Sequence, residues 1–182
     1  MAETPSFGSG FSQGIAALEP GTNRDAYSRP EACFQARSDS VSVSNVYLLD
    51  TNVVMELRKP KPHGAVVQWI QNIAEADLHI SAVTIGEIQA GIEVTREQDE
   101  AKAAEIEQWL DLVATAFNVV PMDAAAFRVW ARLMHGSSDT LYEDAMIAAI
   151  AKVHKYTLVT RNVKDFTQFD VSVLNPFTTS RV

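Results

Sequence analysis

Hydrophobic and polar positions follow two different patterns along the chain. Residues 1–44 are rich in Gly, Ser, Pro and polar side chains, and their apolar positions show no sustained period of 2 or 3.6. We expect this part to be a flexible N-terminal extension, because it offers little apolar surface to bury. From residue 45 to residue 182, short apolar runs alternate with longer periodic segments, and we interpret this part as one domain.

The short apolar runs predict strands, and the segments with apolar residues spaced by three and four predict helices. Val66, Trp69, Ile70 and Ile73, for example, would share one face of a helix. The expected strands are residues 46–49, 78–83, 118–122, 156–160 and 171–176, and the expected helices are residues 51–57, 65–76, 84–94, 97–117, 123–134 and 140–155. Strands that alternate with helices predict an α/β fold in which helices cover both faces of a parallel sheet. Ligands bind such sheets beyond the carboxyl ends of the strands.

The composition is typical of a globular protein of ordinary size. The 182 residues are 47% hydrophobic and 21% charged, and no apolar run is long enough to cross a bilayer. The chain shows no secretory signal, and its single cysteine, Cys33, rules out an internal disulfide framework. We therefore expect a cytoplasmic protein without a membrane partner. The four scattered histidines lack the spacing of zinc ligands.

The net charge of −8 gives no electrostatic steering toward a nucleic acid. Residues 45–182 carry eighteen acids and twelve bases. If four of those acids held cations in a site, the remaining net charge of this part would be only −2. The overall charge therefore does not exclude an anionic substrate.

Four carboxylates stand just after expected strands or near the start of helices that enter the same edge of the sheet. Asp50 follows the first strand, and Glu87 lies one turn into the helix after the second strand. Asp144 lies near the start of the helix at 140–155, and Asp165 follows the fourth strand through a short loop. The carboxyl ends of parallel strands meet at one edge, so these four acids are candidates for a shared site.

Three of these acids also have a purely structural interpretation. Asp50 suits the N-cap of the next helix, although Thr51 or Asn52 could cap it instead. Thr84 and Glu87 have the spacing of a capping box, and Asp165 could cap the turn that follows it.

Two features favour a shared site over separate caps. Thr140 and Glu143 form a capping box of their own, which leaves Asp144 without a structural task. Asp144 and Glu87 are also each followed, one or two turns on, by small residues. These are Ala148, Ala151, Ala90 and Gly91. Small side chains allow two helices to approach closely, which would bring the two acids together.

Carboxylates that gather without compensation repel one another, and their pKa values rise. A hard divalent cation removes this repulsion, and Mg²⁺ or Mn²⁺ prefers oxygen ligands and retains several waters. Such a site can activate water and stabilise the charge of an in-line attack at phosphorus. An all-carboxylate cluster without His or Cys therefore predicts metal-dependent hydrolysis of a phosphodiester.

At this point the chain resembles the PIN-domain ribonucleases, specifically the VapC/FitB-type toxins of bacterial type II toxin–antitoxin pairs. The matching segments are "LLDTNVVMELRK", "SAVTIGEIQAGI", "EDAMIAAIA" and "LVTRNVKDF". No single segment is specific, but all four occur in the family's order across residues 46–177. The extension at residues 1–44 departs from the family, whose members usually begin within a few residues of the first strand.

The resemblance implies a PIN-like α/β/α sandwich with a central five-stranded parallel sheet, formed by residues 45–182. It implies Mg²⁺- or Mn²⁺-dependent hydrolysis of single-stranded or structured RNA, a homodimer, and a cognate antitoxin whose C-terminal segment blocks the acidic pocket. Carried over residue by residue, the catalytic and metal-binding acids are Asp50, Glu87, Asp144 and Asp165. The polar side chains that would orient ligands or water beside them are Asn52, Thr160 and Asn162.

Several interpretations stay open. Cations flank the matched segments and are candidate contacts of the RNA backbone, with a solvated surface charge as the alternative for each. They are Arg58, Lys59, Lys61, Arg161 and Lys164. The helices around Ile92 and Trp109 are either a partner surface or part of the core. Other functions are a catalytically silent PIN-like binding module, a single-stranded DNA nuclease and a phosphoryl-transfer enzyme. Asn52 counts against phosphatases of the haloacid-dehalogenase type, which place a second Asp there.

Overall fold

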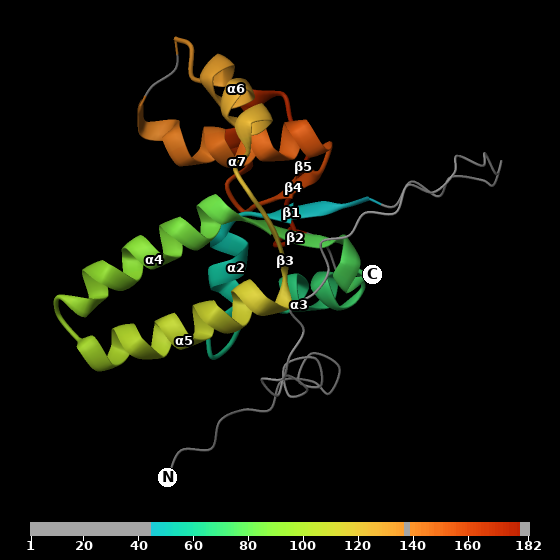
Figure 1. The fold of residues 1–182 in the computed structure, drawn as a ribbon. Coiled ribbons are helices and arrows are strands. Elements are labelled where there is room, and N and C mark those ends of the chain that lie inside the picture. Colours follow the sequence, from blue (N-terminus) through green and yellow to red (C-terminus); the bar gives the residue numbers. More distant parts are fainter. Residues whose placement is uncertain (1–44, 137–138, 179–182) are drawn as a thin grey trace, which may run out of the picture. The chain divides into compact units, whose positions relative to one another are not determined.

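A computed structural model describes residues 45–136 and 139–178 of the chain (Figure 1). The expected extension at residues 1–44 lies outside the described residues. The strands are β1 (Tyr47–Leu49), β2 (Leu78–Ser81), β3 (Asn118–Val120), β4 (Thr157–Val159) and β5 (Val173–Leu174). They form one sheet in the order β3-β2-β1-β4-β5, and every neighbouring pair is parallel. The expected five-stranded parallel sheet is therefore confirmed.

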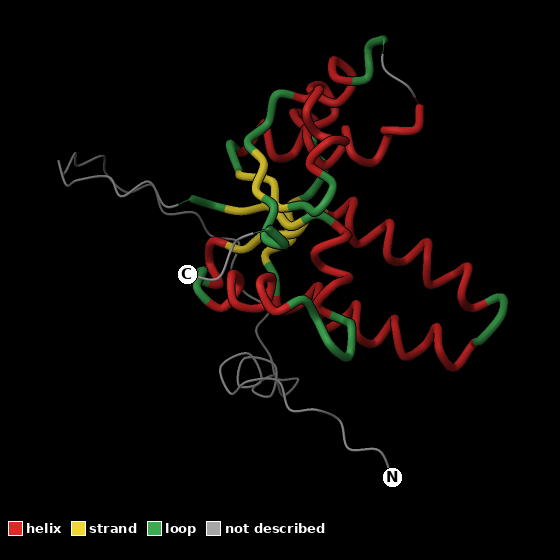
Figure 2. The backbone as a smooth tube through the Cα atoms, turned by 180° about the vertical axis from the view of Figure 1, so that it is seen from behind, coloured by secondary structure: helices red, strands yellow, loops and turns green. Residues whose placement is uncertain are grey.

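Helices separate the strands along the chain. They are α2 (Thr51–Leu57), α3 (Gly64–Gln71), α4 (Ala82–Arg96), α5 (Glu100–Ala116), α6 (Ala124–Leu133), α7 (Tyr142–His154) and α8 (Val163–Phe166), with short 3₁₀ turns η1 (Glu75–Asp77), η2 (Asp139–Leu141) and η3 (Thr167–Phe169). In Figure 2 the strands lie between the α6–α7 pair and the group formed by α2 to α5. Among the described residues, no helix combines the length and apolar character that a membrane span needs.

Alternation along β1 and β4 divides the core between the two faces of the sheet. Leu48 and Leu158 pack on one face with α6, α7, Phe166 and Phe169. Leu49 and Val159, one residue further along each strand, pack on the opposite face with α2 to α5. This is the consequence of a side-chain period of two in strands that are covered on both faces.

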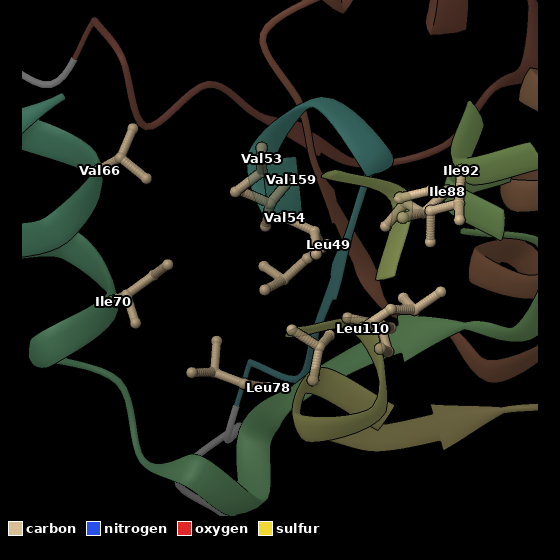
Figure 3. Close-up of a cluster of buried hydrophobic side chains, with 13 residues drawn as sticks. Leu49, Val53, Val54, Val66, Ile70, Leu78, Ile88, Ile92, Leu110 and Val159 are labelled. Carbon is tan, nitrogen blue, oxygen red and sulfur yellow. The ribbon is translucent and has the colours of Figure 1, made fainter. Parts of the chain in front are cut away.

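The larger of these faces is closed by helices from four separate chain segments. Figure 3 shows Val66 and Ile70 of α3 pointing toward Leu49 and Leu78 of the sheet. Ile92 of α4 is fully buried in the same cluster, and Trp109 of α5 packs against it, half-buried. The helices around these two residues are therefore part of the core on this side.

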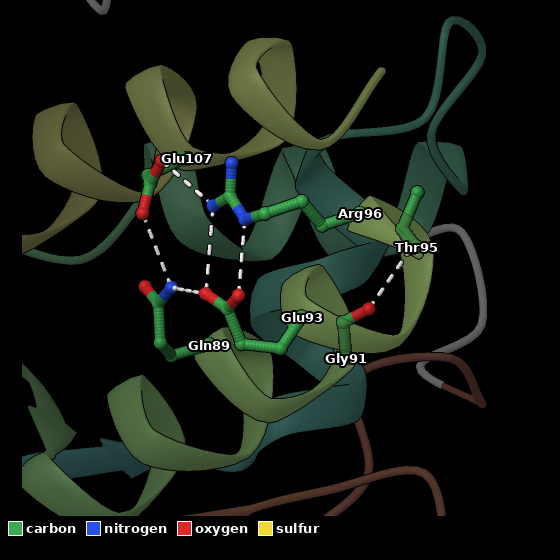
Figure 4. A network of polar contacts seen from close by, with 6 residues as sticks. All are labelled: Gln89, Gly91, Glu93, Thr95, Arg96 and Glu107. Atoms are coloured by element: carbon green, nitrogen blue, oxygen red, sulfur yellow. Dashed lines mark hydrogen bonds and ion pairs between the residues drawn. The ribbon is translucent and has the colours of Figure 1, made fainter. Parts of the chain in front are cut away.

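The hairpin of α4 and α5 is joined at its surface by a polar network (Figure 4). The guanidinium of Arg96 donates to Glu93, at 3.0 Å, and to Glu107, at 2.9 Å. The amide of Gln89 donates to the same two carboxylates. These groups are partly exposed to solvent, so the network contributes little to the stability of the fold.

Several helix boundaries differ by one to five residues from those expected from the periodicity, and side-chain contacts explain two of them. The helix expected over 65–76 ends at Gln71, where the side chain of Asn72 donates back to the carbonyl of Gln68 at 2.8 Å. The helix expected to begin at Thr84 begins at Ala82, because Ser81 Oγ accepts the backbone N–H of Thr84 at 2.9 Å. The predicted strand at 78–83 is shortened by the same cap.

Candidate active site

The candidate site lies where the direction of the sheet reverses. The chain leaves β1 toward β2 on one side, whereas β4 is the neighbour of β1 on the other side. Asp50 follows β1, and its N–H donates to the carbonyl of Val159 at 3.0 Å. Thr160 follows β4 directly. Loops leave in opposite directions at such a switch point, and this opens a place for a ligand beyond the strand ends.

Asp50 is held at this point by donors from both strand ends. Only 5% of the residue is exposed. Its Oδ1 accepts the N–H of Thr51 at 2.7 Å, and its Oδ2 accepts the hydroxyl of Thr160 at 2.6 Å and the amide of Asn52. Burial raises the pKa of Asp50, the three donors oppose that shift, and the charge of Asp165 adds to it. Asp50 is also the N-cap of α2, so the suggestion that Thr51 or Asn52 caps this helix is wrong.

Asn52 and Thr160, which the resemblance places beside the acids, contact each other. Asn52 Nδ2 donates to Thr160 Oγ1 at 3.0 Å, and Asn52 Oδ1 accepts the N–H of Arg161 at 3.1 Å. Thr160 Oγ1 also accepts the N–H of Asn162 at 3.0 Å. Asn162 thus enters this network through its backbone, and its side chain makes no cap bond to α8. The network fixes the loop after β4 against the start of α2.

Glu87 extends from α4 toward the same place. Its Oε2 accepts the hydroxyl of Thr51 at 2.5 Å. Burial raises the pKa of Glu87, and the charges of Asp50, Glu143 and Asp144 raise it further. Because α4 begins at Ala82, Glu87 lies in its second turn, so the capping-box interpretation of Glu87 is wrong. Thr51 was missed as a functional candidate, and its position next to Asp50 was the signal that could have identified it.

Asp144 lies in the first turn of α7, together with Glu143. The capping box expected from Thr140 and Glu143 is wrong, because α7 begins at Tyr142 and its N-cap is Leu141, which makes no side-chain cap bond. Burial raises the pKa of Asp144 to about 6, with further contributions from the charges of Asp50, Asp165 and Glu143. Those contributions show that the acid is close to charges from β1 and α8.

Asp165 lies in α8, where its N–H donates to the carbonyl of Asn162 at 3.2 Å. Its negative charge raises the pKa of both Asp50 and Asp144. The turn-cap role considered from the sequence is replaced by a place inside this short helix. The four acids thus form one electrostatic group, although their positions in the chain span more than a hundred residues.

The small residues that follow Asp144 are buried, whereas those that follow Glu87 are exposed. Ala148 and Ala151 of α7 are buried, as close packing requires. Ala90 and Gly91 of α4 are exposed, so the expectation that they allow α4 to approach another helix is wrong. The carboxylate of Glu87 is instead held by a hydrogen bond from the hydroxyl of Thr51.

The donor set, which consists of carboxylate oxygens, suits a hard divalent cation. Among the described residues, no three His, Cys, Asp or Glu side chains are arranged so that they would enclose one ion directly. Asp50 and Glu87 instead direct oxygens toward protein donors. Mg²⁺ usually keeps several waters and takes only one or two carboxylates, so it does not require a closed cage. Burial is the main cause of the raised pKa values of Asp50, Glu87 and Asp144, and neighbouring carboxylate charges, which such an ion would offset, add to it.

Three of the five candidate RNA-binding cations pair with acids. Arg58 contacts Glu105 at 3.0 Å, and its guanidinium also lies 6.0 Å from the ring centre of Trp109. Lys59 and Arg161 both pair with Glu56, at 2.6 and 3.6 Å. The exposed residues Lys61 and Lys164 lie in the loop after α2 and in α8.

Comparison with known proteins follows the same part of the chain. A family model described as "PIN domain" matches residues 47–171. Toxin FitB of Neisseria gonorrhoeae is 31% identical over 137 residues, which cover 71% of this chain and 97% of the relative. VapC ribonuclease Y4jK of Sinorhizobium fredii is 33% identical over 138 residues, which cover 71% of this chain and 96% of the relative.

A solved structure shows the same fold. The crystal structure of FitAcB from Neisseria gonorrhoeae matches with a TM-score of 0.64 and 30% sequence identity, covering 73% of this chain and 99% of the solved chain. The matched family model covers more than half of the chain, from β1 to the residues just before β5. The chain therefore belongs to the PIN domain family.

Proposed function

We propose that this protein is an endoribonuclease of the VapC/FitB type that depends on Mg²⁺ or Mn²⁺ and acts as the toxin of a toxin–antitoxin pair in the cytoplasm. The relatives named above as a toxin and as a ribonuclease support the reaction class. The observation that carries the proposal is the group of four acids, Asp50, Glu87, Asp144 and Asp165. They interact electrostatically at the carboxyl edge of the sheet.

Each of the chain's own groups has a task in this proposal. The hydroxyl of Thr160 and the amide of Asn52 fix one oxygen of Asp50, and the hydroxyl of Thr51 fixes one oxygen of Glu87. Fixed oxygens are preorganised, so they need not reorient when substrate arrives. Asp144 and Asp165 supply the remaining negative charge from α7 and α8.

The metal ion belongs to this proposal through the chemistry of the oxygen donors. When bound, Mg²⁺ or Mn²⁺ would lower the pKa of its water and offset the charge that develops on the phosphate. Asp50 and Asp144 would hold it, and the effect of the Asp50 charge on the pKa of Asp144 supports their proximity. The negative charge of Asp165 raises the pKa of both acids, and Asp165 would be a further acid of the same site.

The proposal also includes protein partners. A toxin of this type is restrained by a cognate antitoxin, and the family resemblance implies a homodimer. Purification of the chain from cells that express its own operon should yield a small second protein in a fixed ratio. Recovery of the chain alone, with full nuclease activity, would contradict the antitoxin part of the proposal.

A cleavage assay tests the enzyme itself. The full chain is incubated with labelled single-stranded RNA in Mg²⁺ or Mn²⁺, and then with a chelator in excess. We expect cleavage that stops with the chelator, and that Asp144→Asn abolishes while Asp170→Asn does not. Asp170 is a suitable control because it is fully exposed and pairs only at the surface, with Lys152.

The outcome also separates the alternatives. Cleavage of single-stranded DNA in place of RNA would favour the DNA nuclease, and a chain that cuts neither polymer would favour a binding module. Cleavage by Asp144→Asn at the wild-type rate would remove this acid from the site.

A further inference from the structure

Glu56 of α2 is a buried charge that the proposed reaction does not use. The carboxylate is only 5% exposed. Its Oε2 accepts Lys59 Nζ at 2.6 Å and lies 3.6 Å from the guanidinium of Arg161, and its Oε1 accepts the N–H of His63 at 3.0 Å. Buried carboxylates are retained where they are paired and hydrogen-bonded, so these partners explain why the charge is tolerated. They leave open what the charge is for.

Glu56 holds Arg161 together with a second residue of the same helix. Asn52 and Glu56 are four positions apart, so they lie on one face of α2. Asn52 Oδ1 accepts the backbone N–H of Arg161 at 3.1 Å, while Glu56 pairs with its guanidinium. One helix face thus hydrogen-bonds the main chain of Arg161 and forms an ion pair with its side chain.

The other side of Arg161 is held by the segment after β5. The side-chain amide of Asn175 donates to the carbonyl of Arg161 at 3.3 Å. The ring centre of Phe177 lies 4.4 Å from the guanidinium carbon, within the range of a cation–π contact. Despite these contacts, 51% of the Arg161 side chain is exposed. Arg161 is therefore an oriented cation that can still meet a ligand.

Arg161 also lies next to the acidic site along the chain. Arg161 directly follows Thr160, whose hydroxyl donates to Asp50. It therefore stands at the rim of the acidic site. A planar guanidinium that is already oriented suits a phosphate oxygen pair, and it loses little further freedom on binding.

We infer that Glu56 is a positioning residue that orients the guanidinium of Arg161 to bind a phosphate of the RNA strand beside the acidic site. This inference rests on the proposed ribonuclease function. It selects Arg161 from the five candidate cations, because Arg161 directly follows Thr160 and is held from two sides. It also assigns a role to an acid outside the metal-binding group.

A change in net charge and a loss of positioning predict opposite effects on RNA binding for the same substitution at Glu56. The substitution Glu56→Gln removes a negative charge from beside two cations. If only net charge mattered, RNA would bind more tightly to this variant. If Glu56 orients Arg161, RNA binds more weakly even though the protein is less acidic.

Steady-state cleavage of labelled single-stranded RNA in Mn²⁺ distinguishes the two. We expect Arg161→Ala to raise KM by about tenfold and to reduce the dependence of log KM on log salt by about 0.7. Glu56→Gln should raise KM by roughly two- to tenfold, because RNA binding would then have to order the long side chain of Arg161, and kcat should be unchanged. In the double variant, the loss of Glu56 should add nothing to the loss of Arg161.

The matched control is Glu107→Gln, which also removes one Glu partner of an arginine but on the α4–α5 hairpin, where Arg96 keeps its pair with Glu93 (Figure 4). Its KM should equal that of the wild type.

A Glu56→Gln variant with the same or a lower KM than the wild type overturns the inference while cleavage by the wild type stands. If Glu56→Gln does not fold, as judged by its melting curve, Arg161→Ala decides, and a wild-type KM for it overturns the inference. A wild-type chain that cuts no RNA overturns both the proposed function and this inference.

Discussion

The hydroxyl of Thr160 makes three hydrogen bonds that join the strand ends of the site. It donates to Asp50 Oδ2 at 2.6 Å, and it accepts from Asn52 Nδ2 and from the N–H of Asn162, each at 3.0 Å. Thr160 is fully buried, so water does not replace a lost partner. The substitution Thr160→Val keeps the shape of the side chain and removes all three bonds.

The magnitude follows from the kind of bond that is lost. A hydrogen bond to a charged group contributes about 1.5–3 kcal/mol, and a buried donor left without a partner adds to the cost. We therefore expect Thr160→Val to lower the free energy of unfolding by roughly 2–3 kcal/mol. For a domain of this size, that corresponds to a fall in Tm of roughly 5–10 °C.

Urea or thermal unfolding of both proteins measures this loss, and Thr115→Val on α5 is the control. The exposed hydroxyl of Thr115 donates only to the carbonyl of Asp111, so its removal should change stability by less than about 0.5 kcal/mol. Activity should fall together with stability, because Asp50 loses its fixed orientation. A Thr160→Val protein as stable as the control would refute the view that this hydroxyl holds the site together.

Three further predictions follow from the electrostatics and the packing. Asp144→Asn should reduce cleavage by more than roughly 100-fold, yet raise the Tm of the metal-free protein at pH 7, because it removes a repelled charge. The pKa of Asp144 is raised from 3.8 to about 6 in the folded state. Between these two pH values the folded protein therefore binds a proton that the unfolded chain does not hold, so stability rises as pH falls. Metal-free wild type should therefore gain stability as pH falls from 7 toward 5, and a pH series of melts in which Asp144→Asn shows the same gain would contradict this. Phe166→Ala, beside Asp165, should lower the free energy of unfolding by about 3–5 kcal/mol, because Phe166 is buried on the face of the sheet that α6 and α7 cover.

The strands were predictable because each one is a short apolar run bounded by polar residues. Asp50 could be placed at the sheet edge for the same reason, since it interrupts apolar character directly after Leu49. Alternation then placed Leu48 and Leu49 on opposite faces. These features depend on local sequence and on a period of two, which a single chain displays directly.

The caps of α4 and α7 could not be predicted, because capping patterns occurred in more than one register. Ser81 and Thr84 both precede the apolar run of α4, and the structure uses Ser81 as the cap. The Thr140 pattern was an acceptable capping box that α7 does not use. Local patterns of this kind are decided by where tertiary packing lets a helix begin.

The fine structure of the site depends on contacts between distant segments. The bond from Thr51 to Glu87 spans 36 positions, and the bond from Thr160 to Asp50 spans 110. Glu56 follows the same logic, because it is buried by Arg161 and His63 from other parts of the chain. Its sequence neighbours alone suggest an ordinary exposed residue of a helix.

Binding of Mn²⁺ to the full chain tests the central claim most directly, because it requires no RNA and no cleavage. Calorimetric titration of the wild type should give a saturable site, and neutralising any one of Asp50, Glu87, Asp144 or Asp165 by amide substitution should weaken it. Asp170→Asn should bind as the wild type does. A wild type that binds no Mn²⁺, or four amide variants that bind it unchanged, would contradict the claim that these acids form one cation site.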